Sequence, residues 1–153
     1  MYPVHKARLA RWQVIVLCTS GLLLWASGAA WLALHYFAQV EGPFGPQSNP
    51  LEPWMLRCHG AAMLVMLVGA GSLLVVHVWH GWKHRRQRWI GLALLGVLTL
   101  LTITGYLLYY PPGDDAHATV SAIHWVIGLG ALPLFLWHYL KGRRARRRRG
   151  HAA

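Results

Sequence analysis

The stretch Trp54–Trp82 reads WMLRCHGAAMLVMLVGAGSLLVVHVWHGW, and Arg57 is its only residue with a permanent charge. A helix needs about 20 mostly apolar residues to cross the ~30 Å hydrocarbon core of a bilayer. We therefore expect this stretch to form a transmembrane helix. It also contains His59, His77 and His80, and ionisable side chains inside a membrane are costly and usually functional.

Apolar runs of similar length lie on both sides of this stretch. The expected helices are 12–37, 54–82, 89–110 and 119–140. The short segments between them are rich in Pro and Gly or strongly basic, so none continues an apolar helix. Because short connections join antiparallel neighbours, we predict an all-α membrane protein folded as a four-transmembrane-helix up-down bundle. Residues 1–153 would form a single membrane domain that includes a basic tail at 141–153.

The composition excludes two other classes of protein. Hydrophobic residues make up 56% of the chain and charged residues only 12%, about half the charged share of a soluble domain. The high hydrophobic content also excludes a disordered chain. The net charge of +11 comes from cations grouped in short blocks between apolar runs, which predicts membrane topology and no nucleic acid as partner.

Charge also predicts the orientation. Basic residues precede the first helix, connect the second to the third, and follow the fourth, whereas the acids lie at the opposite ends of the helices: Glu41, Glu52, Asp114 and Asp115. The positive-inside rule then places both termini on the cytoplasmic side of the membrane. We expect this membrane to be a bacterial-type inner (plasma) membrane. The basic tail is expected to contact anionic lipids.

The histidines repeat at helical intervals. On the second helix His59 and His77 are separated by five full turns, so they point the same way. On the fourth helix the separation of His124 and His138 is about 40° short of four turns. His80 lies about 60° away from the face of His59 and is the second choice to His77.

In an up-down bundle the second and fourth helices run in the same direction. Each would then offer one outer imidazole, His59 or His124, and one inner imidazole, His77 or His138. Haem iron binds axial imidazoles on a flat macrocycle and fits this pattern twice. The four histidines are therefore candidate cofactor-binding residues and ligands of the haem iron. The sequence contains no Cys-x-x-Cys-His motif for covalent attachment.

Several short segments resemble the di-haem core of membrane b-type cytochromes, which include cytochrome b subunits of quinol-oxidising complexes, formate dehydrogenases and hydrogenases. These segments are Arg57–Ala62, His77–Trp82, Gly105–Tyr110, Ile123–Gly128 and Trp137–Tyr139. The resemblance implies two non-covalent haem b groups and electron transfer with the quinone pool.

Other residues are candidates for roles near the cofactor. Met63 precedes His77 by the same interval that separates His124 from His138 and is an alternative axial ligand at the outer haem. His35 and His117 are candidates for a quinone site or a haem edge, and His35 is also a fallback ligand of the haem iron. Arg57 either pairs with a haem propionate through charge-assisted hydrogen bonds or balances Glu52.

The expected function is that of a transmembrane b-type cytochrome with two haems held by bis-His ligation. It would transfer electrons between quinone or quinol and a periplasmic or membrane redox protein, alone or as the cytochrome subunit of a quinone-linked oxidoreductase. The alternative is a non-redox four-helix membrane protein, such as a transporter subunit or assembly factor, whose histidines bind metal or protons. The sequence suggests no catalytic triad or paired catalytic carboxylates, so we assign no catalytic residue.

Overall fold

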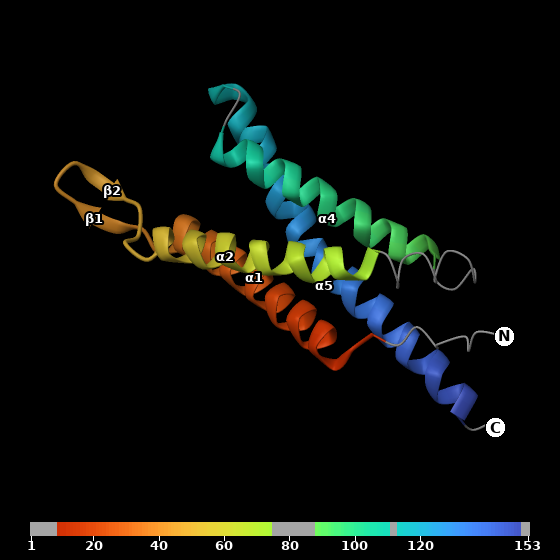
Figure 1. Ribbon diagram of the computed structural model, residues 1–153. Coiled ribbons are helices and arrows are strands. Elements are labelled where there is room, and N and C mark those ends of the chain that lie inside the picture. The colour runs from red at the N-terminus through yellow and green to blue at the C-terminus, as the bar shows by residue number, and fades with distance from the viewer. Residues whose placement is uncertain (1–8, 75–87, 111–112, 151–153) are drawn as a thin grey trace. The chain divides into compact units, whose positions relative to one another are not determined.

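A computed structural model describes residues 9–74, 88–110 and 113–150, without the side chains of 115 and 146–150. The chain divides into two compact units, Met1–His80 and Gly81–Ala153. Within the described residues each unit is built on a pair of helices (Figure 1). His77 and His80 lie outside the described residues.

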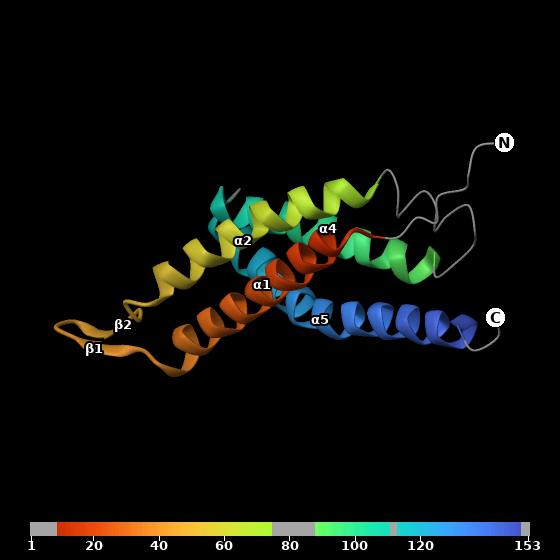
Figure 2. The ribbon, with the colours of Figure 1, turned by 60° about the horizontal axis from the view of Figure 1, so that its bottom comes forward.

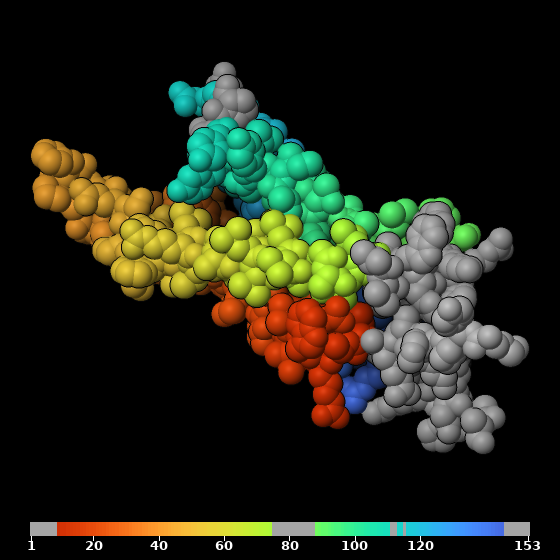
Figure 3. Space-filling model, in the orientation of Figure 1, coloured from red at the N-terminus to blue at the C-terminus, as the bar shows by residue number. Residues whose placement is uncertain are grey.

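The first unit is an antiparallel helical hairpin. Helix α1 spans Arg11–Phe37 and helix α2 spans Glu52–Leu73. The start of α1 lies beside the end of α2 (Figure 3), where the Gln13 amide donates a hydrogen bond to Ser72 Oγ at 3.1 Å. We call this unit the first hairpin.

A two-stranded antiparallel ribbon connects α1 to α2. Strand β1 (Val40–Gly42) pairs with strand β2 (Gly45–Gln47), and the ribbon projects beyond the ends of the two helices (Figure 2). Gly45 has φ +106°, a left-handed conformation that favours glycine in a tight turn. The sequence predicted only a linker here, because the alternation of such short strands cannot be recognised.

The second unit is also an antiparallel helical hairpin. Helix α4 spans Arg88–Tyr109, and helix α5 spans Asp114–Gly150. Helix α5 continues through Pro133 and includes the first part of the basic tail. We call this unit the second hairpin.

The predicted spans are confirmed as helices wherever the structure describes them. Helices α1, α2 and α4, together with Ala116–Ala145 of α5, are the four described helices long and apolar enough to cross a membrane. Helices α2 and α5 differ most from the predicted bounds. Helix α2 begins earlier, at Glu52, because Pro53 is tolerated in the first turn. Helix α5 is longer at both ends, which agrees with the favourable placement of acids at its start and cations at its end.

The burial pattern is inverted relative to a water-soluble domain. Among the described residues, Ala62 is the buried hydrophobic side chain, whereas four buried side chains are polar or charged: Ser20, Ser27, Glu52 and Thr104. Large apolar side chains point outward, for example Leu64 at 68% and Val68 at 75% exposure. Extended apolar surface around polar helix contacts is what a multi-pass membrane protein presents to lipid.

Candidate functional site

The first hairpin holds His59 against α1. The Nδ1 atom of this α2 residue lies 3.0 Å from Ser27 Oγ. The next residue on α1 is Gly28, and a Cβ added there would lie 3.3 Å from His59 Cε1. The glycine therefore allows the imidazole to lie close to the backbone of the neighbouring helix.

The second hairpin holds His124 against α4 in the same way. The Nδ1 atom lies 2.8 Å from Thr104 Oγ1. The next residue on α4 is Gly105, and a Cβ added there would lie 3.4 Å from His124 Cε1. Each hairpin thus pairs a hydroxyl–glycine dipeptide on its first helix with a histidine on its second.

His124 and His138 of α5 both lie opposite glycines of α4. A Cβ added at Gly91 would lie 4.0 Å from His138 Cε1, just as Gly105 approaches His124. The interval from Gly91 to Gly105 equals the interval from His124 to His138. Because the helices are antiparallel, equal spacings keep both histidine–glycine pairs in register along the hairpin.

At the centre of the first hairpin, the side chain that lies opposite a glycine of α1 is a methionine and not a histidine. A Cβ added at Gly21 would lie 3.1 Å from the terminal methyl group of Met66, and Ser20 Oγ lies 3.8 Å from the Met66 sulfur. Met63, the alternative ligand, is half-buried on α2. Its sulfur is not among the described hydrogen-bond partners of α1.

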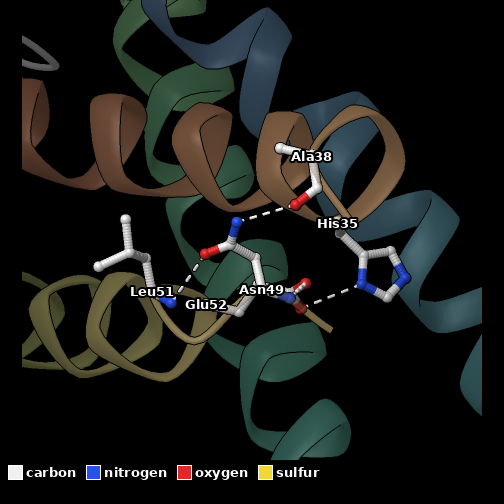
Figure 4. Close-up of polar contacts among 5 residues, drawn as sticks. All are labelled: His35, Ala38, Asn49, Leu51 and Glu52. Carbon is white, nitrogen blue, oxygen red and sulfur yellow. Dashed lines mark hydrogen bonds and ion pairs between the residues drawn. The ribbon is translucent and has the colours of Figure 1, made fainter. Parts of the chain in front are cut away.

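A polar cluster joins the end of α1 to the start of α2 (Figure 4). His35 Nδ1 lies 3.1 Å from Glu52 Oε2, and the backbone N–H of Asn49 donates to Glu52 Oε1 at 3.1 Å. The Asn49 side chain in turn donates to the Ala38 carbonyl at 2.8 Å. Glu52 is only 6% exposed. The cluster fixes the geometry of the connection between the two helices.

The cluster places His35 beside Glu52. The Glu52 carboxylate lies 3.1 Å from His35 Nδ1, whereas the Arg57 guanidinium lies 4.8 Å from the centroid of the Trp54 ring. Both interpretations of Arg57, as the partner of a haem propionate and as the balance of Glu52, stay predictions. His35 also stacks on Trp31 with ring centroids 4.7 Å apart, so its described neighbours come from the first hairpin.

Among residues 9–74, 88–110 and 113–150, no three His, Cys, Asp or Glu side chains converge to hold a metal ion. His59, His124 and His138 instead occupy separate positions along their helices.

Sequence reasoning identified these three histidines but missed their neighbours. Ser27 and Thr104 were not singled out, because a hydroxyl inside an apolar helix usually bonds to its own backbone. The available signal was the pair of dipeptides Ser27-Gly28 and Thr104-Gly105 on the first helix of each half of the chain. Comparison with protein-family models, curated proteins and solved structures finds no match to this chain.

Proposed function

We propose that this protein is a transmembrane b-type cytochrome that binds two haem b groups and transfers electrons between the quinone pool and a redox partner protein. The observation that supports this proposal is the repeated arrangement in the two hairpins. His59 and His124 each lie against a glycine, with Nδ1 beside a buried hydroxyl. A histidine that merely snorkels to the membrane surface requires no such pairing.

The spacing within the second hairpin supports ligation at two depths. His124 and His138 are separated by about 21 Å along α5. Both lie opposite glycines of α4. Two imidazoles near opposite sides of a hydrocarbon core about 30 Å thick suit a pair of cofactors for electron transfer across it.

The proposal assigns axial ligands by depth. His59 and His124 would hold the outer haem, and His77 and His138 the inner one. His80 and Met63 remain the alternative ligands, and Arg57 is the candidate partner of a haem propionate. Haem supplies reversible one-electron chemistry when bound.

The chain's own residues would orient the imidazoles and exclude water. Glycines at the contacts allow the rings to lie close to a neighbouring helix. The proposal also retains the cytoplasmic termini, the inner-membrane location, and the contact between the basic tail and anionic lipids. Quinol and the partner protein would exchange electrons at opposite ends of this arrangement.

Haem content in purified protein tests the proposal. A reduced-minus-oxidised spectrum and a haem-to-protein ratio near two are expected. His124→Ala and His59→Ala should each remove about half of the haem, because each deletes an axial donor. His117→Ala is the control for axial ligation, since this histidine near the start of α5 is a candidate for a quinone site or a haem edge and not for an axial bond.

Two results would contradict the proposal. The first is a colourless wild-type protein that remains colourless after haemin is added, which would favour the non-redox alternative. The second is equal loss of haem in His117→Ala and His124→Ala.

A further inference from the structure

The hydroxyl groups beside the two histidines already use their hydrogens. Ser27 Oγ donates to the Leu23 carbonyl, with an O···O distance of 2.6 Å. Thr104 Oγ1 donates to the Leu100 carbonyl at 2.8 Å. Both are bonds from a helical hydroxyl to the carbonyl one turn earlier, a common arrangement for Ser and Thr inside helices.

Because each hydroxyl hydrogen is used in the bond to a backbone carbonyl, the direction of the hydrogen bond between the hydroxyl and the imidazole is determined. A hydroxyl has one hydrogen and can also accept. Two oxygens as close as 2.6 or 2.8 Å need a hydrogen between them, so the hydroxyl hydrogen stays on the carbonyl side. The hydroxyl oxygen must then accept from the ring, which requires a hydrogen on Nδ1.

The tautomer of a neutral imidazole follows from that direction. When Nδ1 has the hydrogen, the lone pair of the ring is on Nε2. The same reasoning holds for His59 with Ser27 and for His124 with Thr104, at Nδ1 distances of 3.0 and 2.8 Å. The second-sphere hydrogen bond that fixes a metal-binding histidine in proteins has this form.

Burial makes the arrangement persistent. Ser27 is 7% exposed and Thr104 is 5% exposed. Water therefore does not compete readily for either hydroxyl, and hydrogen bonds gain strength in such low-dielectric surroundings.

We propose that Ser27 and Thr104 are positioning residues that hold His59 and His124 in the Nδ1–H tautomer and present Nε2 as the metal-binding nitrogen. The identity of the metal group as haem rests on the proposed function, whereas the tautomer assignment does not. Each hydroxyl acts through the ring that it orients.

The tautomers can be measured without any cofactor. Nitrogen-15 magnetic resonance of histidine-labelled, haem-depleted full-length protein in lipid nanodiscs distinguishes a protonated ring nitrogen from an unprotonated one. The measurement is made above the range in which imidazole protonates, with signals assigned by His59→Gln and His124→Gln. Both histidines should have hydrogen on Nδ1.

Paired variants separate positioning from general packing. Ser27→Ala should reduce the share of the Nδ1–H tautomer at His59, whose ring also hydrogen-bonds to the Leu24 backbone, and should leave His124 unchanged. Thr104→Ala should do the reverse. Ser27→Thr and Thr104→Ser should restore the wild-type signals, because they retain the hydroxyl.

The chain provides matched controls on the same helices. Ser20 is buried and donates to the Val16 carbonyl at 2.6 Å, and Thr102 donates to the Leu98 carbonyl at 2.7 Å. The described side-chain hydrogen bonds of these two residues include no histidine. Ser20→Ala and Thr102→Ala should therefore leave both tautomers unchanged.

Haemin titration of the same variants tests the effect on metal binding. Loss of the hydrogen-bond partner of a metal-binding histidine typically weakens metal affinity by roughly 10–100-fold. Ser27→Ala and Thr104→Ala should therefore each weaken haemin binding at the outer site by that factor. Hydrogen on Nε2 in the wild type would overturn the inference, as would tautomers or affinities that respond equally to Ser27→Ala and Ser20→Ala. Nδ1–H tautomers in a protein that binds no haemin would uphold the positioning of the rings and refute the haem assignment.

Discussion

Two glycines on one face of α1 provide a sharp test of how the imidazole is held. Gly21 and Gly28 are two turns apart, so they face α2 at successive depths. A Cβ at Gly21 would approach the Met66 methyl group to 3.1 Å, and a Cβ at Gly28 would approach His59 Cε1 to 3.3 Å. Distance alone predicts that Gly21→Ala is the more harmful substitution.

The flexibility of the side chain that each new Cβ would meet predicts instead that Gly28→Ala is the more harmful substitution. Met66 ends in a flexible thioether that can rotate away, whereas the His59 ring is tied to Ser27 through Nδ1. Either substitution gains about 1 kcal/mol of helix propensity. Overpacking against a fixed ring costs about 1–3 kcal/mol. Gly28→Ala should therefore destabilise the protein by about 0–2 kcal/mol, and Gly21→Ala should be neutral or stabilising by up to about 1 kcal/mol.

Reversible unfolding in detergent micelles measures both values, and Gly60→Ala supplies the reference because no atom lies within 4 Å of a Cβ there. Gly28→Ala should also lower haem content, since it displaces the ring, while Gly21→Ala should not. If Gly21→Ala is as destabilising as Gly28→Ala, the claim that Ser27 immobilises the His59 ring is wrong.

Three further predictions concern the ends of the helices and the ligand register. Glu52→Ala should lower the free energy of unfolding of the first hairpin by about 1–3 kcal/mol, because His35 and the Asn49 N–H lose their buried acceptor. Glu41→Ala, at an exposed control position, should change the free energy of unfolding by less than about 0.5 kcal/mol. Equal effects of the two substitutions would refute the role of the cluster. Protease sites inserted in the β1–β2 turn should be cut from outside intact cells and a C-terminal reporter should be active only in the cytoplasm; a reporter active only outside would reverse the topology. His77→Ala should halve the haem content measured by difference spectroscopy, and His80→Ala should leave the haem content intact. The opposite result would make His80, and not His77, the inner ligand on the second helix.

The four described helices that are long and apolar enough to cross a membrane could be predicted from sequence, because hydrophobic length is a local property. Each run exceeds the thickness of the hydrocarbon core, and the prediction needs no knowledge of helix pairing. The ends of the helices were less predictable. Extension of α5 to Gly150 depends on the helix-forming tendency of Lys and Arg, which an apolar pattern does not register.

The environment of the histidines depends on the register between helices and could not be read from one helix at a time. Ser27 meets His59 across 32 residues of chain, and Thr104 meets His124 across 20. The different separations reflect a longer connection in the first hairpin, where β1 and β2 are inserted. The Glu52–His35 pair was missed for the same reason, since Arg57 is nearer to Glu52 in sequence.

The pairing of each helix with its neighbour in the chain has a consequence for biosynthesis. The His59–Ser27 contact needs only the chain up to the end of α2, so the protein can form it before α4 has been translated. The His124–Thr104 contact likewise needs only the helices made last. Contacts between helices adjacent in sequence form quickly because they close short loops, and we expect each half to acquire its imidazole geometry during synthesis, before any cofactor is loaded.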